Sequence, residues 1–156
     1  MAVKYSIDTS AILDGWRRYY PPSSFPGLWI RIEELIQQGH LRATEEVLHE
    51  LEKRDDEVLE WAKAQDGFFI PIDQPIQAAV ASVLSGFPKL IDTRQNRSAA
   101  DPFVIALAKV EGCAVVTGEG PTASDKRPHI PDVCRAMGIK TLRLLDLIVE
   151  EGWIFR

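Results

Sequence analysis

The strongest constraint on the fold is the alternation of short apolar β-type runs with segments of helical periodicity. The clearest run is Cys113-Ala114-Val115-Val116-Thr117, which is almost continuously apolar, as expected of a strand covered on both faces. Strands that alternate with helices along a chain predict a parallel sheet with helices on both faces. We therefore expect an α/β fold with three layers, α/β/α, around a central parallel sheet.

The expected elements follow from this alternation and from the residues that interrupt it. Helices are expected to end at Gly39 and Gly112, because glycine favours the conformation that follows a helix. Another helix is expected to end at the stretch 20–24, because its prolines break a helix. Strands are expected over residues 3–8, 41–44, 68–70, 113–117 and 139–144. Helices are expected over residues 11–19, 26–38, 45–62 with a break at 55–56, 76–84, 103–111, 132–137 and 145–151, with loops at 88–98 and 118–131.

Length and composition limit the class of protein. A chain of 156 residues has the size of one domain, and we expect residues 1–156 to form a single domain. Cys113 and Cys134 are too few for a disulfide framework and lack zinc-finger spacing. No apolar stretch reaches the roughly 20 residues that a bilayer requires, and the first residues lack the features of a signal peptide. We expect a cytoplasmic protein without membrane association.

The net charge of the chain restricts how it can bind nucleic acid. At −5, it argues against a broad basic surface that neutralises phosphates. It leaves room for a small nucleic-acid site whose positive charge is supplied by metal ions. Local cations are present in two loops, where they could contact an RNA backbone or simply face solvent: Lys89, Arg94, Arg97, Lys126 and Arg127.

Four acidic residues are expected near one edge of the sheet. In open parallel sheets, ligands bind beyond the carboxyl ends of the strands. Asp8 follows the first strand and Glu119 follows the strand 113–117, while Asp101 begins the helix that leads into that strand. Glu50 lies on the helix after the second strand. Four carboxylates can therefore converge on one rim.

Each of these residues also has a purely structural interpretation. Asp8 and Asp101 are residues suited to capping a helix, and Pro102 directly after Asp101 strengthens that interpretation. Glu50 lies among other glutamates at the edge of an apolar stripe, and helical spacing does not choose between Glu50 and Glu52. Glu119 lies in a loop and could face solvent. Taken singly, each signal is weak.

Taken in order, the acidic motifs resemble those of the PIN-domain family over essentially the whole chain. Ile7-Asp8-Thr9-Ser10-Ala11-Ile12-Leu13 resembles the opening motif, and Val47-Leu48-His49-Glu50-Leu51 is similar to the motif on the family's third helix. Ala100-Asp101-Pro102-Phe103-Val104-Ile105-Ala106-Leu107-Ala108 resembles the third motif closely. The segment His129-Ile130-Pro131-Asp132-Val133-Cys134 resembles a PIN-like subfamily catalogued as a domain of unknown function.

The fourth motif departs from the family pattern. Val115-Val116-Thr117-Gly118-Glu119 resembles a motif that usually reads Thr-x-Asp-x-Asp, so the second acidic residue is missing from its usual place. Asp125, further along the loop, is a candidate substitute.

The resemblance implies a metal-dependent ribonuclease, often the toxin of a VapC-type, type II toxin–antitoxin pair. It implies that Asp8, Glu50, Asp101 and Glu119 bind Mg²⁺ or Mn²⁺, with Asp8 and Asp101 as shared ligands. Clustered carboxylates suit these oxygen-ligated ions. Hydroxyls that could bind ligand oxygens or a phosphate are those of Thr9, Ser10 and Thr117. The expected partners are an RNA substrate, a cognate antitoxin protein and a second copy of the chain.

Two other functional classes remain open at this level. A degenerate PIN-like module would bind nucleic acid or protein without cutting it. Aspartyl-phosphate chemistry of the haloacid-dehalogenase type would use Asp8, but it needs a second aspartate two residues on, where this chain has Ser10. Trp16, Tyr19 and Tyr20, near Arg17-Arg18, could stack on bases, although core packing or a dimer surface explains such aromatics equally well.

Overall fold

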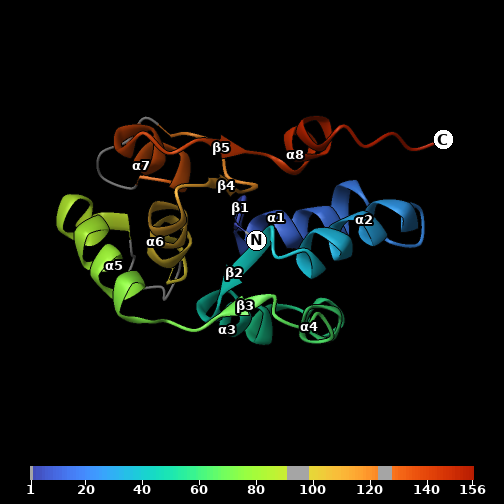
Figure 1. Ribbon diagram of the computed structural model, residues 1–156, viewed down its shortest axis with the longest axis horizontal. Coiled ribbons are helices and arrows are strands. Elements are labelled where there is room, and N and C mark those ends of the chain that lie inside the picture. Colours follow the sequence, from blue (N-terminus) through green and yellow to red (C-terminus); the bar gives the residue numbers. More distant parts are fainter. Residues whose placement is uncertain (1, 91–98, 123–127) are drawn as a thin grey trace.

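The computed structural model describes residues 2–90, 99–122 and 128–156. Within these ranges, five short parallel strands form one sheet in the order β3-β2-β1-β4-β5, with β1 in the middle (Figure 1). Tyr5 of β1 pairs with Leu41 on one side and with Ala114 on the other. The strands are β1 (Tyr5–Ile7), β2 (Leu41–Thr44), β3 (Phe69–Ile70), β4 (Ala114–Val116) and β5 (Thr141–Leu142).

Helices connect consecutive strands, as parallel pairing requires. In chain order the helical elements are α1 (Thr9–Asp14), the π-helical turn η1 (Gly15–Tyr19), α2 (Pro26–Gln37), α3 (Glu45–Arg54), α4 (Asp56–Lys63), α5 (Gln74–Gly86), the 3-10 turn η2 (Pro88–Leu90), α6 (Asp101–Glu111), α7 (Ile130–Met137) and α8 (Leu144–Glu151). Among the described residues, no helix is long and apolar enough to span a bilayer.

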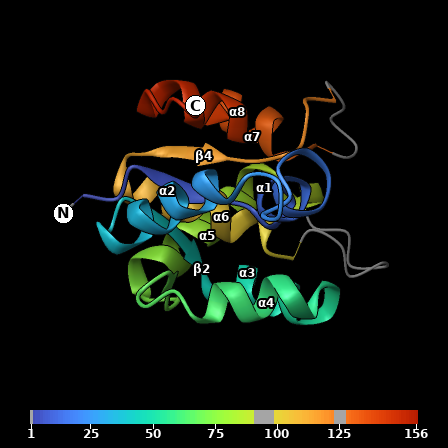
Figure 2. The same ribbon diagram turned by 90° about the vertical axis from the view of Figure 1, so that its right-hand side faces the viewer.

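The helices cover both faces of the sheet and so form three layers. In Figure 1, α5, α6 and α7 lie to the left of the strands, and α1, α2, α4 and α8 lie to the right. Figure 2 shows the N terminus at one end of the strands and α1 toward the other. The expected three-layer α/β fold with a central parallel sheet is confirmed.

Helix α6 forms the centre of the core and positions one of the acidic residues. It packs against β1, β2 and β4, and its residues Val104 to Ala108 are all buried. The hydroxyl of Ser6, which is fully buried in β1, donates a hydrogen bond to the carbonyl oxygen of Val104 at 2.8 Å. Because α6 is held against the middle strand in this way, its first residue, Asp101, is fixed near the carboxyl ends of the strands.

Three differences from the expected elements affect the site. The first helix begins at Thr9, two residues earlier than expected, so Asp8 takes the capping position, and the helix continues into the π-helical turn. Asp101 is the first residue of α6 and not its cap, which is Ala100. The segment 139–144 contains only the two-residue strand β5.

The end of β5 and the start of α8 explain the third difference. The backbone N–H of Arg143 donates to Asp146 Oδ2 at 2.9 Å. This bond belongs to a helix start, so the chain turns into α8 at Leu144 and does not continue as a strand.

Helix α7 also begins earlier than expected, by two residues, at Ile130, because Pro131 fits the first turn of a helix. The expected loop at 88–98 starts with η2.

Candidate metal centre

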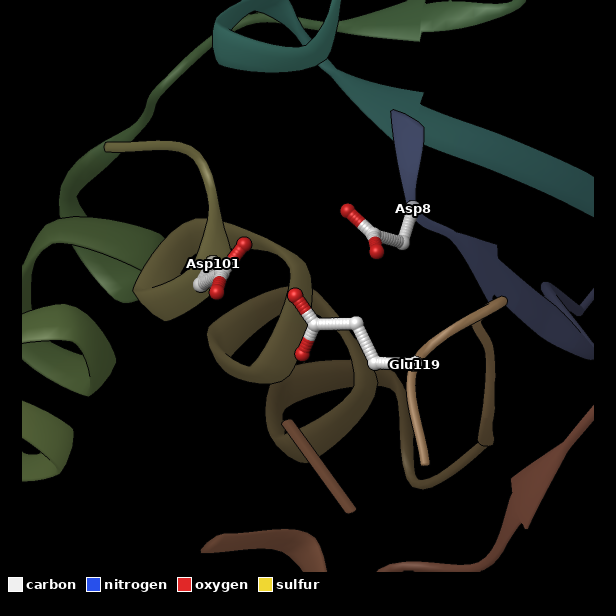
Figure 3. A group of neighbouring side chains, drawn as sticks. All are labelled: Asp8, Asp101 and Glu119. Atoms are coloured by element: carbon white, nitrogen blue, oxygen red, sulfur yellow. The ribbon is translucent and has the colours of Figure 1, made fainter. Parts of the chain in front are cut away.

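Three acidic side chains from distant parts of the chain meet at the carboxyl ends of β1 and β4. Asp8 follows β1, Glu119 lies three residues beyond the end of β4, and Asp101 begins α6. One carboxylate oxygen from each residue lies within 4.8 Å of those from the other two. Figure 3 shows the carboxylates directed toward a common space. Asp8 is 2% and Asp101 5% exposed, whereas Glu119 is half-buried. The structure thus brings together three of the four expected acidic residues.

A network of hydroxyl groups holds Asp8 in place. Ser10 Oγ donates to Asp8 Oδ2 at 2.6 Å, and the buried hydroxyl of Thr117 donates to the same oxygen at 3.0 Å. The backbone N–H of Gly118 donates to Ser10 Oγ at 2.9 Å. These bonds join α1 to the loop after β4 and fix the orientation of the Asp8 carboxylate. Ser10 and Thr117 thus both donate to the Asp8 carboxylate, and position 10 supplies a hydroxyl instead of a second carboxylate.

Glu50 lies beside this cluster and is linked to it through Thr9. The buried hydroxyl of Thr9 donates to Glu50 Oε1 at 2.6 Å. Glu50 is half-buried on α3, whereas Glu52 is exposed and Glu46 lies 3.7 Å from His49 Nδ1. Among these three glutamates, only Glu50 contacts a residue of the Asp8 network within the described part of the chain.

The loop after β4 is packed closely enough to fix the position of Glu119. Glu119 Oε2 accepts a hydrogen bond from the N–H of Ile130, the first residue of α7, at 3.0 Å. A Cβ atom added to Gly118 would lie 2.5 Å from Asp14 Oδ2 and 3.2 Å from the carbonyl oxygen of Ser10. Glycine at 118 therefore lets the loop lie directly against α1, with Glu119 turned toward the cluster.

Burial raises the pKa values of three carboxyl groups at the site, and the charge of Asp8 adds to the rise for two of them. Burial raises the pKa of Asp8, although hydrogen bonds from Ser10 and Thr117 partly offset this effect. Burial also raises the pKa of Glu50, and the charge of Asp8 adds to the rise against the opposing bond from Thr9. For Glu119, burial raises the pKa most, followed by the charge of Asp8. The folded site therefore favours the presence of protons or cations.

The raised pKa values predict a pH-dependent stability of the metal-free protein. The folded state holds protons on these groups more tightly than the unfolded state. The free energy of unfolding therefore falls as the pH rises from about 4 through the raised pKa values. Each unit by which a pKa is raised lowers the free energy of unfolding by about 1.4 kcal/mol once the pH exceeds that raised pKa. In EDTA, we expect wild-type Tm to fall more steeply between pH 5 and pH 8 than that of Asp8→Asn. Parallel Tm curves for the two proteins would contradict this expectation.

The donor set fits a hard divalent cation. The converging atoms are carboxylate oxygens, which suit Mg²⁺ or Mn²⁺. Cys134 is fully buried nearby, but burial and the charges of Asp8 and Glu119 raise the pKa of its thiol to about 12. Sulfur is moreover a soft ligand, which Mg²⁺ and Mn²⁺ do not prefer. The oxygen donors therefore define the chemistry of the site.

Most of the expected loop cations, and the substitute acidic residue Asp125, lie in segments that the structure does not describe. Arg94, Arg97, Asp125, Lys126 and Arg127 lie outside the described residues. Lys89 is exposed in η2.

The aromatic and arginine residues near η1 have separate surroundings. Trp16 is packed into a cluster with Trp29 and Trp61, with ring centroids 4.9 and 5.7 Å away. Arg17 pairs with Asp55 at 2.7 Å. The core-packing interpretation thus holds for Trp16, whereas Tyr19 remains 61% exposed.

Sequence reasoning missed Arg143 as a residue of this rim. Arg143 directly follows β5 and lines a small hollow of about 120 Å³ together with Thr117 and Glu119. The rule that located Asp8 and Glu119, polar residues just beyond strand ends, applies to it as well. The expectation of a strand through residue 144 placed Arg143 inside a strand and so hid this signal.

Comparisons with known proteins agree with the architecture. The crystal structure of DNA-bound VapBC from Salmonella typhimurium aligns with a TM-score of 0.55 and 13% identity, covering 90% of this chain and 98% of that one. The crystal structure of FitAcB from Neisseria gonorrhoeae aligns with a TM-score of 0.53 and 17% identity, covering 88% and 96%. At such identities the likeness concerns the fold alone, and it supports the PIN-like architecture. No curated protein sequence matches the chain significantly. Residues 5–155 match the model of a family described as "Domain of unknown function (DUF4411)".

Proposed function

The chain belongs to the DUF4411 family, and for this member we propose the function of a divalent-metal-dependent ribonuclease that hydrolyses RNA phosphodiester bonds. The observation that carries the proposal is the convergence of Asp8, Asp101 and Glu119 within 4.8 Å at the carboxyl edge of a PIN-like sheet. A buried acidic cluster of this kind is costly for a fold unless a cation neutralises it. The family-like order of the motifs supports the same conclusion.

The proposed chemistry assigns a role to each residue of the site. Asp8, Asp101 and Glu119 would hold Mg²⁺ or Mn²⁺, with Glu50 completing the acidic set from α3. Such an ion activates water and stabilises charge on the phosphate and the leaving oxygen. Ser10 and Thr117 keep the Asp8 carboxylate in a fixed orientation, and Thr9 does the same for Glu50. The remaining candidates, Asp125 and the five loop cations, stay predictions.

The names of the similar structures support a toxin–antitoxin role. They are the assemblies VapBC, bound to DNA, and FitAcB. By analogy we propose that this chain is the nuclease of such a pair, with a cognate antitoxin protein as partner. A cytoplasmic location fits this proposal, as do Cys113 and Cys134, which are free thiols. Assembly of the chain into a homodimer is a further proposal, which analytical sedimentation tests.

A cleavage assay tests the proposed activity. Purified protein is incubated with structured RNA, unstructured RNA and single-stranded DNA, in Mn²⁺ and in EDTA. We expect cleavage of RNA in Mn²⁺ and none in EDTA. Binding of RNA without any cleavage in either Mn²⁺ or Mg²⁺ would contradict the proposal and favour a binding module.

Glutamine substitutions on α3 test the assignment of Glu50. Glu50→Gln removes a charge beside the cluster, and we expect at least about a tenfold loss in kcat/KM, equivalent to ~1.4 kcal/mol. Glu52→Gln and Glu46→Gln serve as matched controls on the same helix and should retain activity within about twofold. A large loss in either control with no loss in Glu50→Gln would show that the assignment is wrong.

A further inference from the structure

A second hollow adjoins the acidic cluster on the side of η1 and α8. It measures about 400 Å³ and is lined by residues from α1, η1, the loop after β4 and the start of α8, among them Asp14, Tyr19, Tyr20, Gly118, Arg143 and Leu145. None of the acidic ligands proposed above lines it. It is therefore a separate site that shares a border with the metal centre.

Gly118 connects the hollow to the cluster. It lies in the lining, and its N–H donates to Ser10 Oγ, which in turn donates to Asp8. Arg143 lies in the lining as well, and it also borders the smaller hollow beside Thr117 and Glu119. A group bound in the larger hollow would thus lie next to a phosphate bound at the metal centre.

Close packing between η1 and α8 forms the wall of the hollow. A Cβ atom on Gly15 would lie 2.7 Å from Leu144 Cδ2, so glycine at this position lets the two helices touch. The π-helical turn that starts at Gly15 brings Tyr19 and Tyr20 to the rim. Tyr20 is packed edge-on against Phe25 at 5.5 Å, whereas Tyr19 is 61% exposed and its ring is accessible.

The lining combines aromatic and apolar residues with two residues of opposite charge. Tyr19 and Leu145 offer surfaces for a planar ring. Asp14 and Arg143 both reach the hollow, and in the described part of the chain neither forms an ion pair with the other or with a third residue. A lining with one hydrogen-bond acceptor group, one donor group and aromatic surface fits a heterocycle that carries donors and acceptors on its edges.

We propose that this hollow binds a guanine base of the RNA, next to the phosphate at the metal centre. The proposal rests on the proposed ribonuclease function and names a specificity site for it. Guanine presents two N–H donor groups on one edge, which match the carboxylate of Asp14, and two acceptors on the other, O6 and N7, which match the guanidinium of Arg143. Adenine lacks the paired donors for a carboxylate, and uracil offers only one.

Neutral nucleosides test the hollow without any cleavage and without phosphate repulsion. Binding to the full chain in EDTA is measured by NMR titration with guanosine, inosine, adenosine and uridine. We expect guanosine to bind about 5- to 150-fold more tightly than adenosine, the range that corresponds to one bidentate base contact. Inosine, which lacks the amino group, should lose most of that preference.

Variants of the lining separate stacking from edge recognition. Tyr19→Ala should weaken guanosine binding about 5- to 150-fold, as loss of a stacked base does, and Tyr19→Phe should restore it. Asp14→Asn should abolish the difference between guanosine and inosine. Phe155→Ala, an exposed aromatic outside this lining, is the control and should bind as wild type does.

The outcomes distinguish this proposal from the ribonuclease activity itself. Equal binding of all four nucleosides to the wild type, or unchanged binding in Tyr19→Ala, would overturn the guanine site even if RNA is cleaved in Mn²⁺. Selective binding of guanosine that depends on Tyr19 and Asp14 supports the guanine site, even if no RNA is cleaved. A map of cleavage positions adds the final check: wild-type cuts should lie next to guanosine, and Asp14→Asn should lose that preference.

Discussion

Replacement of Asp101 or Asp8 by asparagine is expected to reduce RNA cleavage at least about a thousand-fold. Both side chains are nearly fully buried in the cluster, and each contributes a carboxylate oxygen to the space that a cation would occupy. Loss of a shared ligand removes charge stabilisation worth several kcal/mol, and ~4 kcal/mol corresponds to a factor of about a thousand. The measurement is the initial rate of cleavage in Mn²⁺.

Two controls accompany this measurement: the fold of each variant, and the effect of replacing an aspartate outside the cluster. Asparagine has nearly the size and shape of aspartate, so both variants should retain the circular dichroism spectrum of the wild type. Asp66→Asn, which changes an exposed aspartate outside the cluster, should cut RNA at the wild-type rate. Wild-type rates in both Asp8→Asn and Asp101→Asn would refute the assignment of the site.

Addition of Mn²⁺ is expected to raise the Tm of the wild-type protein by roughly 5–10 °C. An ion that binds only the folded state stabilises it by about 2.7 kcal/mol at a hundredfold excess over Kd. For a domain of this size, each kcal/mol shifts Tm by ~2–4 °C. The stabilisation arises because the cation relieves repulsion among carboxylates that burial forces together. Differential scanning fluorimetry in EDTA and in millimolar Mn²⁺ measures the shift.

The variant Asp101→Asn separates a metal site from a purely structural role at the start of α6. Without metal it should melt at least as high as the wild type, because one repulsive charge is gone, and it should respond little to Mn²⁺. If Asp101 served only to favour the start of α6 through its negative charge, the substitution would lower the metal-free Tm slightly and leave the response to Mn²⁺ as large as in the wild type. A wild-type melting curve that is unaffected by both Mn²⁺ and Mg²⁺ would count against the whole cluster.

The layered fold was predictable because it depends on hydrophobic patterning that the sequence carries locally. The apolar run before Thr117 and the stop at Gly112 locate β4 and the end of α6 within one or two residues. Element ends that depend on tertiary contacts were less predictable. The π-helical turn that begins at Gly15, where the chain lies directly against Leu144, is not indicated by any local pattern in the sequence.

The candidate site was predictable where its residues follow strand ends, and less so elsewhere. Asp8 and Glu119 could be located from strand topology, and Asp101 from the start of a helix. The relation of Glu50 to Asp8 runs through the hydroxyl of Thr9, and its geometry depends on how α3 packs beside α1. Arg143 was missed because the length of a two-residue strand cannot be inferred from composition. Roles in catalysis stay predictions for all these residues.

The most direct test of the central claim is the chemistry of the RNA ends that the protein produces. Wild type and Asp101→Asn, purified in parallel, are incubated with one end-labelled RNA in Mn²⁺ and in EDTA, and the fragments are identified by mass spectrometry. Hydrolysis by water activated at the acidic cluster predicts fragments without a 2′,3′-cyclic phosphate, formed only by the wild type and only in Mn²⁺. Cyclic phosphates, cleavage in EDTA, or equal cleavage by Asp101→Asn would contradict it.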